Sequence, residues 1–237
     1  MEQTGIKPQN AKLPATDIPD EQLQRLLAFG CADEFLTAPA SDDLPGNSLR
    51  NLPMEQLEEA VIRLLKPQRV PHVLGCRDTA VQLARLWGAD ETDAARAGLL
   101  HDITKALDGP LQLHVCRCYG VELGEFSRKN PKTLHALTGS LVAQRIFGEN
   151  EAVVSAICAH TTGKPHMNTL EKIIYVADYM EPNRDFPGVE QLRSLAFTDL
   201  DAALKLGLTM TLDMLKEQGR EISPESRQTL AWLNEQK

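Results

Sequence analysis

The stretch ETDAARAGLLHDITKA, residues 91–106, decides the fold prediction. Ala94, Ala97 and Gly98 precede His101 by seven, four and three residues, so all four share one face of a helix. Side chains this small let a neighbouring helix approach closely, although ordinary helix packing would use them equally well. The stretch therefore predicts a buried helix that carries the adjacent polar pair His101 and Asp102 toward the core.

The same helical spacing of apolar residues continues on both sides of this stretch. Asn130 before Pro131 is typical of a helix start, whereas Gly88 and Gly148 are typical of helix ends. No segment shows convincing strand alternation, so the predicted fold class is all-α. The predicted helices cover residues 54–65, 71–87, 91–106, 111–119, 131–147, 151–160, 169–180, 188–215 with a break near Thr198, and 224–234.

Proline divides the chain into two parts. Residues 1–54 hold six of the 14 prolines, which predicts an N-terminal extension of low regular structure and unknown role. Within it, only a stretch from about Glu21 to Phe29 and another around Phe35 are apolar enough for short helices. Residues 55–237 form the predicted helical domain.

Composition excludes several classes of protein. The 237 residues are 42% hydrophobic and 24% charged, which is typical of a globular protein. The 25 basic and 33 acidic residues give a net charge of −8, which disfavours nucleic acid and anionic membranes as partners. No apolar run could span a bilayer and the first residues lack a secretory signal, so we expect a cytoplasmic protein. Five scattered cysteines predict neither a disulfide framework nor a thiolate zinc site.

Six metal-ligand side chains fall on the inward faces of five predicted helices. A single buried histidine is more often bonded to a backbone carbonyl, and a single Asp178 would more often cap a helix or pair with an arginine. Their joint placement favours metal, because unpaired buried imidazoles and carboxylates lose hydration. Nitrogen and oxygen ligands suit Fe, Mn, Co or Zn, and six suit two ions about 3.5–4 Å apart bridged by a carboxylate. The six residues are His72, His101, Asp102, His135, His160 and Asp178.

Two segments carry a family resemblance. His72 followed by AGLLHDITK, residues 97–105, resembles the HD-domain metal-dependent phosphohydrolases. The later HTTG, residues 160–163, and YVADYMEP, residues 175–182, with Arg184 resemble the YqeK family within that superfamily. The resemblance covers about residues 60–237 and implies an HD-domain helical bundle.

The resemblance also implies an activity and a set of ligands. It indicates a two-metal enzyme, with iron as the expected metal, that cleaves diadenosine tetraphosphate symmetrically to two ADP through a metal-bridged hydroxide. His72, His101, Asp102 and Asp178 would be the HD-domain ligands, with Asp102 bridging. His135 and His160 would complete the second metal site.

Five cationic or imidazole side chains are candidates for substrate contact. Lys105 lies one turn beyond Asp102 and is also a candidate catalytic residue; a solvated helix end is its alternative. Arg184 follows the Glu181-Pro182-Asn183 turn and could instead form a surface ion pair. Lys164 and His166 follow His160 in a loop, and Arg128 precedes the helix that carries His135. Phosphate favours cations and helix N-termini, although solvated charges are equally typical of such positions.

Other functions fit parts of the same pattern. A di-iron oxygenase could use the same ligands, and another nucleotide, such as a guanosine polyphosphate of the (p)ppGpp type, could be the substrate. A nucleotide-binding module without activity is the non-enzymatic alternative. Phosphate loops, dinucleotide fingerprints and serine-hydrolase elbows are missing from the sequence. The expected partner is a small dinucleoside polyphosphate, and a homodimer is an open option.

Overall fold

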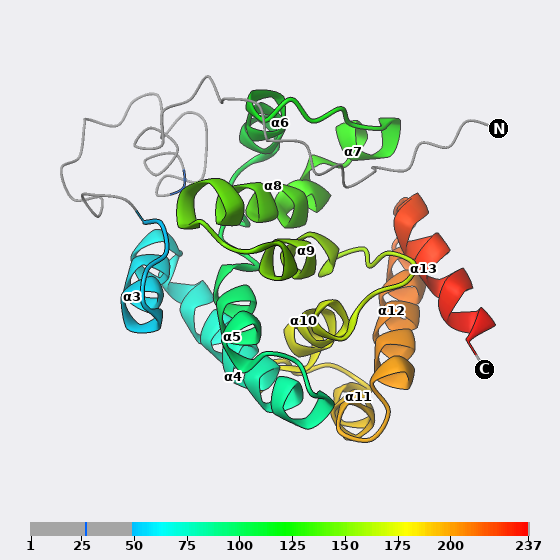
Figure 1. Cartoon of the computed structure of the whole chain (residues 1–237). Coiled ribbons are helices and arrows are strands. Elements are labelled where there is room, and N and C mark those ends of the chain that lie inside the picture. The colour runs from blue at the N-terminus through cyan, green and yellow to red at the C-terminus, as the bar shows by residue number, and fades with distance from the viewer. Residues whose placement is uncertain (1–26, 28–48, 237) are drawn as a thin grey trace.

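The computed structural model describes Leu27 and residues 49–236, and the regular structure of these residues is entirely helical (Figure 1). This confirms the all-α prediction. The elements are α3 (Met54–Leu64), η1 (Pro67–Arg69), α4 (Val70–Trp87), α5 (Glu91–Leu100), α6 (Gly109–Cys118), α7 (Glu125–Lys129), η2 (Pro131–Leu134), α8 (His135–Val142), η3 (Ala143–Phe147), α9 (Glu151–Ala159), α10 (Thr169–Met180), α11 (Val189–Ala196), α12 (Leu200–Glu217) and α13 (Pro224–Glu235).

Several predicted boundaries are confirmed. Gly88 and Gly148 end their helices in the left-handed conformation, with φ of 71° and 74°. The predicted break near Thr198 separates α11 from α12, and the side chain of Asp199 caps α12 by accepting a hydrogen bond from the backbone N–H of Ala202. Glycine conformational freedom and side-chain capping thus set these boundaries as the sequence indicates.

The predicted helix over 91–106 is wrong at its C-terminal end, because α5 stops at Leu100. From there the backbone forms successive turns, in which the N–H groups of Ile103 and Lys105 bond to carbonyls three residues earlier. Adjacent residues of a straight α-helix point about 100° apart. The turns allow His101 and Asp102 to face the same centre, with His101 Nε2 3.5 Å from Asp102 Oδ2.

The predicted helix over 131–147 is three elements, a 3-10 turn η2, the α-helix α8 and a π-helical turn η3. Asn130 does not cap it. Its side-chain amide instead donates to the carbonyl of Phe126 and to Glu221. The short helix α7 was not predicted, because five residues are too few to show helical periodicity.

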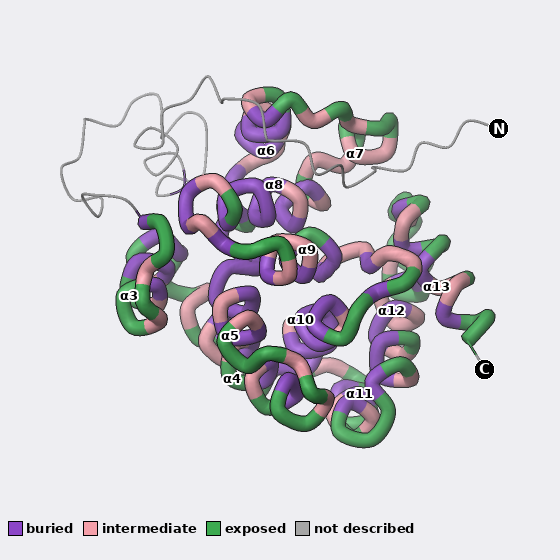
Figure 2. Tube along the Cα trace, in the orientation of Figure 1, coloured by how far each residue is buried: buried purple, intermediate pink, exposed green. Residues whose placement is uncertain are grey.

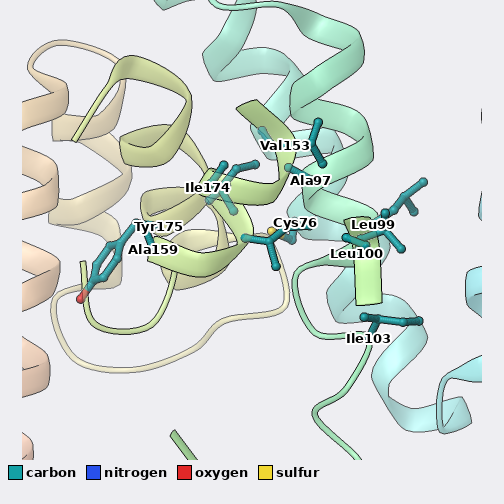
Figure 3. Close-up of a cluster of buried hydrophobic side chains, with 14 of the residues drawn as sticks. Cys76, Ala97, Leu99, Leu100, Ile103, Val153, Ala159, Ile174 and Tyr175 are labelled. Carbon is teal, nitrogen blue, oxygen red and sulfur yellow. The ribbon is translucent and has the colours of Figure 1, made fainter. Parts of the chain in front are cut away.

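Helices α4, α5, α9 and α10 form the centre of the bundle, α11 and α12 pack against α10, and α13 packs against α12 (Figure 1). The predicted close packing at Gly98 is present, since a methyl group there would lie 2.7 Å from the Cα of Arg77 in α4. Figure 2 shows that many residues of these central helices are buried. Apolar side chains from α4, α5, α9 and α10 meet between them, including Cys76, Leu100 and Ile174 (Figure 3).

The described residues before α3 pack on the helical bundle. The backbone N–H of Asn51 donates to Phe147 O at 2.8 Å, and Arg96 donates to Leu52 O at 2.9 Å while pairing with Glu149. Leu27 is helical and buried, but the rest of the predicted helix over 21–29 and the one around Phe35 lie outside the described residues. A domain boundary after residue 54 stays a prediction. None of the helices described is both long and apolar enough to cross a bilayer.

Candidate metal centre

The six predicted ligands meet in the middle of the bundle. His72 comes from α4 and Asp178 from α10, while His101 and Asp102 occupy the turn after α5. His135 is the first residue of α8, and His160 directly follows α9. All are buried except Asp178, whose side chain is 17% exposed. The structure therefore brings together every residue that the sequence predicts as a ligand.

Three of the four imidazoles are oriented by their own backbone. His101, His135 and His160 each place Nδ1 on the carbonyl oxygen three residues earlier, at 2.8, 2.9 and 2.6 Å. A carbonyl only accepts hydrogen bonds, so Nδ1 carries a proton, and Nε2 is the nitrogen whose lone pair can be offered to a metal at the centre. This is the tautomer that a metal ligand requires.

His72, His101, Asp102 and Asp178, called here the His72 group, form one half of the centre. Nε2 of His72 lies 3.2 Å from His101 Nε2 and 3.1 Å from Asp178 Oδ1. Oδ2 of Asp102 lies 3.6 Å from His72 Nε2. The ligand atoms of His72, His101 and Asp102 all lie within 4.8 Å of one another, close enough to hold one ion.

Asp102, His135 and His160, called here the His135 group, form the other half. Oδ1 of Asp102 lies 3.5 Å from His135 Nε2 and 3.7 Å from His160 Nε2, and the two nitrogens are 3.2 Å apart. Oδ1 is buried and accepts no hydrogen bond. Asp102 thus turns one oxygen to each group, and its orphaned oxygen together with the facing lone pairs fits a second cation.

The pKa values of the clustered carboxyl and imidazole groups are shifted by burial and by one another. Burial lowers the pKa of His135 to about 3, and Lys105 adds to the effect, so His135 is neutral at pH 7. Burial would raise the pKa of Asp102 and of Asp178, but the facing imidazoles outweigh it and hold both carboxyls well below their usual range. Burial lowers the pKa of His72, but hydrogen bonds to Asp102 and Asp178 outweigh it, and the net direction is upward.

Three cations stand at the edge of the cluster. Arg69 pairs with Asp102 Oδ2, and Arg184 lies 2.6 Å from Asp178 Oδ1. Lys105 Nζ lies 2.8 Å from His135 Nε2 and 3.6 Å from Asp102 Oδ1. The side chains of Arg69, Arg184 and Lys105 are 30%, 33% and 41% exposed, so each contacts a predicted ligand and is also accessible to solvent. Lys105 and Arg184 thus lie where the sequence predicts them.

The other predicted substrate contacts have different neighbours. Lys164 Nζ lies 2.6 Å from Oε1 of the buried Glu171, while the lysine side chain itself is 42% exposed. The exposed ring of His166 lies against Trp232, with centroids 5.6 Å apart. Arg128 is exposed on α7. None of these contacts joins the side chain to the cluster, so a role in substrate binding stays a prediction for all three.

Sequence reasoning missed three residues that touch the ligands. Arg69 lies one turn before His72, a spacing that could have identified it. Glu181 Oε1 lies 3.1 Å from His72 Nδ1, and Thr161 Oγ1 lies 3.0 Å from His135 Nε2. Thr161 adjoins a ligand and Glu181 lies three residues beyond Asp178, but neither spacing by itself indicates a contact with histidine.

Comparison with known proteins agrees with this geometry. The HD domain family model matches residues 69–183. The crystal structure of a "predicted HD superfamily hydrolase involved in NAD metabolism" from Clostridium acetobutylicum superposes with a TM-score of 0.76 at 37% identity, covering 78% of this chain and 99% of that one. The fold and the site therefore define a helical, metal-binding protein of the HD class.

Two curated relatives narrow the class. "Bis(5'-nucleosyl)-tetraphosphatase, symmetrical" of Halalkalibacterium halodurans is 39% identical over an alignment of 188 residues that covers 73% of this chain and 94% of that protein. The Bacillus subtilis protein of the same name is 36% identical over 180 residues, covering 76% and 96%. The chain belongs to the HD domain family and, within it, to the group formed by these symmetrical bis(5'-nucleosyl)-tetraphosphatases.

Proposed function

We propose that this protein hydrolyses diadenosine tetraphosphate and related dinucleoside polyphosphates symmetrically, giving two ADP. One observation carries the proposal: Asp102 turns one oxygen to each of two histidine groups, in a chain akin to relatives that bear this activity in their name. A nucleotide substrate of this kind also favours a cytoplasmic location for the protein.

Two divalent ions fit the two groups. His72, His101, Asp102 and Asp178 would hold one, and Asp102, His135 and His160 the other. Iron is the metal that we propose, with manganese, cobalt and zinc as alternatives that also accept imidazole and carboxylate. When bound, such ions lower the pKa of water toward about 7 and neutralise phosphoryl charge.

The chain's own residues supply the rest of the electrostatics. Arg69, Lys105 and Arg184 surround the ligands and reach the surface, so they can contact phosphate oxygens that approach the centre. In the protein without substrate these cations pair with the ligand carboxylates. A polyphosphate offers them additional anionic partners, which gives an acidic protein the local positive charge that its substrate needs.

Symmetric cleavage constrains where the substrate lies. Water must add to a phosphorus atom next to the central bridging oxygen, the bond from that phosphorus to the bridging oxygen breaks, and ADP leaves with the bonding electrons. The attacked phosphorus becomes the terminal phosphate of the second ADP, and two protons are released to solvent once both new terminal phosphates are ionised. Lys105, beside both Asp102 and His135, is placed to neutralise charge on the reacting phosphate.

The test is product analysis under anaerobic conditions. The protein loaded with Fe²⁺ or Mn²⁺ is incubated with diadenosine tetraphosphate, and nucleotides are separated by chromatography. ADP as the sole product supports the proposal, whereas ATP with AMP contradicts symmetric cleavage. Turnover that requires dioxygen would favour an oxygenase, and faster hydrolysis of a guanosine polyphosphate would change the substrate. Elemental analysis of the purified protein identifies the metal.

A further inference from the structure

Glu181 lies behind His72, on the side away from the metal ligands. It follows α10 directly, its side chain is 1% exposed, and its Oε1 lies 3.1 Å from His72 Nδ1. The other three imidazoles place Nδ1 on a neutral carbonyl. A carboxylate in this position fixes the tautomer and makes Nε2 a stronger donor to a metal.

The second oxygen of Glu181 is fully used as well. Oε2 accepts from the backbone N–H of Asn183 and from its side-chain amide, both at 2.8 Å. The geometry therefore requires an acceptor at each end of the group. A glutamine would place an NH₂ either against the two donors of Asn183 or against His72 Nδ1, where it would force the tautomer that protonates Nε2.

The residues around Glu181 leave room for its carboxylate and hold the loop that carries it. Gly75 lies one turn beyond His72, and a methyl group on it would overlap Glu181 Oε2. Arg193 holds the loop in place by donating to the carbonyl of Glu181 at 2.9 Å and to that of Arg184 at 2.8 Å. Glycine at position 75 is thus explained by the approach of Glu181, because it costs helix stability otherwise.

Charge is unequal between the two halves of the centre. The His72 group contains Asp102 and Asp178 and has Glu181 behind it, so three carboxylates stand against the two guanidinium groups of Arg69 and Arg184. The His135 group has Asp102 alone, against Lys105 Nζ at 2.8 Å from His135 Nε2. We propose that Glu181 is a positioning residue for His72 and that it makes the ion of the His72 group the more tightly bound of two. This inference rests on the proposed two-ion centre.

Calorimetric titration of the metal-free, full-length protein with Mn²⁺ tests the inference. We expect two binding events of unequal affinity in the unaltered protein. Glu181→Gln should weaken the tighter event by about 10–100-fold, the range for loss of a residue that orients a ligand, and leave the weaker event unchanged. Glu149→Gln is the matched control: this glutamate is 2% exposed and pairs with Arg96, and its loss should change neither event.

Gly75→Ala provides a second, independent variant. Alanine favours the helix more than glycine does, so α4 should persist while the methyl group displaces Glu181. The tighter event should weaken as in Glu181→Gln, and the double variant should be no worse than the single ones, because both remove the same contact. Circular dichroism checks folding, and if Glu181→Gln fails to fold, Gly75→Ala decides alone.

Three results would overturn the inference: unchanged Mn²⁺ binding by the folded variants, equal weakening of both events, or a single event in the unaltered protein. The titration uses no nucleotide. A protein that shows the expected binding but leaves diadenosine tetraphosphate intact would refute the proposed substrate without touching the role of Glu181.

Discussion

Replacing Asp102 with asparagine should disable both halves of the centre at once. Asparagine keeps the size of the side chain, but it removes the charge and turns one of the two acceptor oxygens into an NH₂ donor. Each oxygen of Asp102 faces a different group of ligands, at 3.5–3.7 Å from the imidazoles of the His135 group and 3.5–3.6 Å from those of the His72 group. One proposed ion therefore loses its oxygen ligand, and the other keeps only an uncharged amide oxygen, so a single substitution weakens both sites.

The magnitude follows from these contacts. Loss of a residue that only orients a ligand lowers metal affinity by about 10–100-fold, so loss of a direct ligand from one ion and of the shared negative charge from the other should cost each ion about 100-fold. We expect kcat/KM for diadenosine tetraphosphate to fall by at least about 1000-fold, equivalent to roughly 4 kcal/mol of transition-state stabilisation. Folding should survive, because Arg69 and Lys105 are 30% and 41% exposed and can return to water.

The assay combines elemental analysis after dialysis, chromatography of the nucleotide products and far-ultraviolet circular dichroism. Asp102→Asn should be helical, nearly free of metal and inactive. Glu149→Gln, which alters a buried ion pair away from the centre, should keep both metal and activity. An Asp102→Asn protein that holds two ions, or that turns over within tenfold of the unaltered protein, would falsify the bridging role.

Four further outcomes are expected. Lys105→Ala should lower kcat/KM by about 10–100-fold, the value of a lost charge-assisted hydrogen bond, with metal content unchanged by elemental analysis. Arg69→Ala should raise KM by about tenfold or more in steady-state assays, and an unchanged KM would argue against phosphate contact. Gly98→Ala should cost about 1–3 kcal/mol in urea unfolding, because the methyl group meets the backbone of Arg77. Removing metal present at 100 times its Kd should cost about 2.7 kcal/mol, or about 5–11 °C in Tm by calorimetry, and an equal Tm with and without chelator would contradict a bound ion.

Local pattern was sufficient to predict most helices and the six side chains that meet at the candidate metal centre. The ligands were predictable because a polar side chain on an apolar helix face needs a partner, and six such side chains in one chain indicate a shared one. The end of α5 was not predictable, since residues 101–106 keep a helical pattern of apolar positions while the backbone forms turns. Those turns are fixed by tertiary contacts, such as the bond from Thr104 Oγ1 to His135 O at 2.9 Å.

The contacts around the ligands were harder to predict. Glu181 reaches the cluster through side-chain placement that depends on how α4 meets the end of α10, a long-range feature with no local signal. The pairing of Lys164 with Glu171 shows the converse case. Lys164 lies in the loop after His160 but pairs with a carboxylate outside the cluster, and the charge pattern along a chain does not reveal such competition.

Asp102 faces a different group of predicted ligands with each of its oxygens, and this arrangement has a consequence for how related proteins can differ. One half of the centre draws on α4, α5 and α10, and the other adds only His135 at the start of α8 and His160 at the end of α9. A descendant that lost just these two histidines would keep an intact mononuclear pocket on an unaltered scaffold. If the proposed two-ion centre is correct, one-ion and two-ion members of this fold could differ by as few as two substitutions.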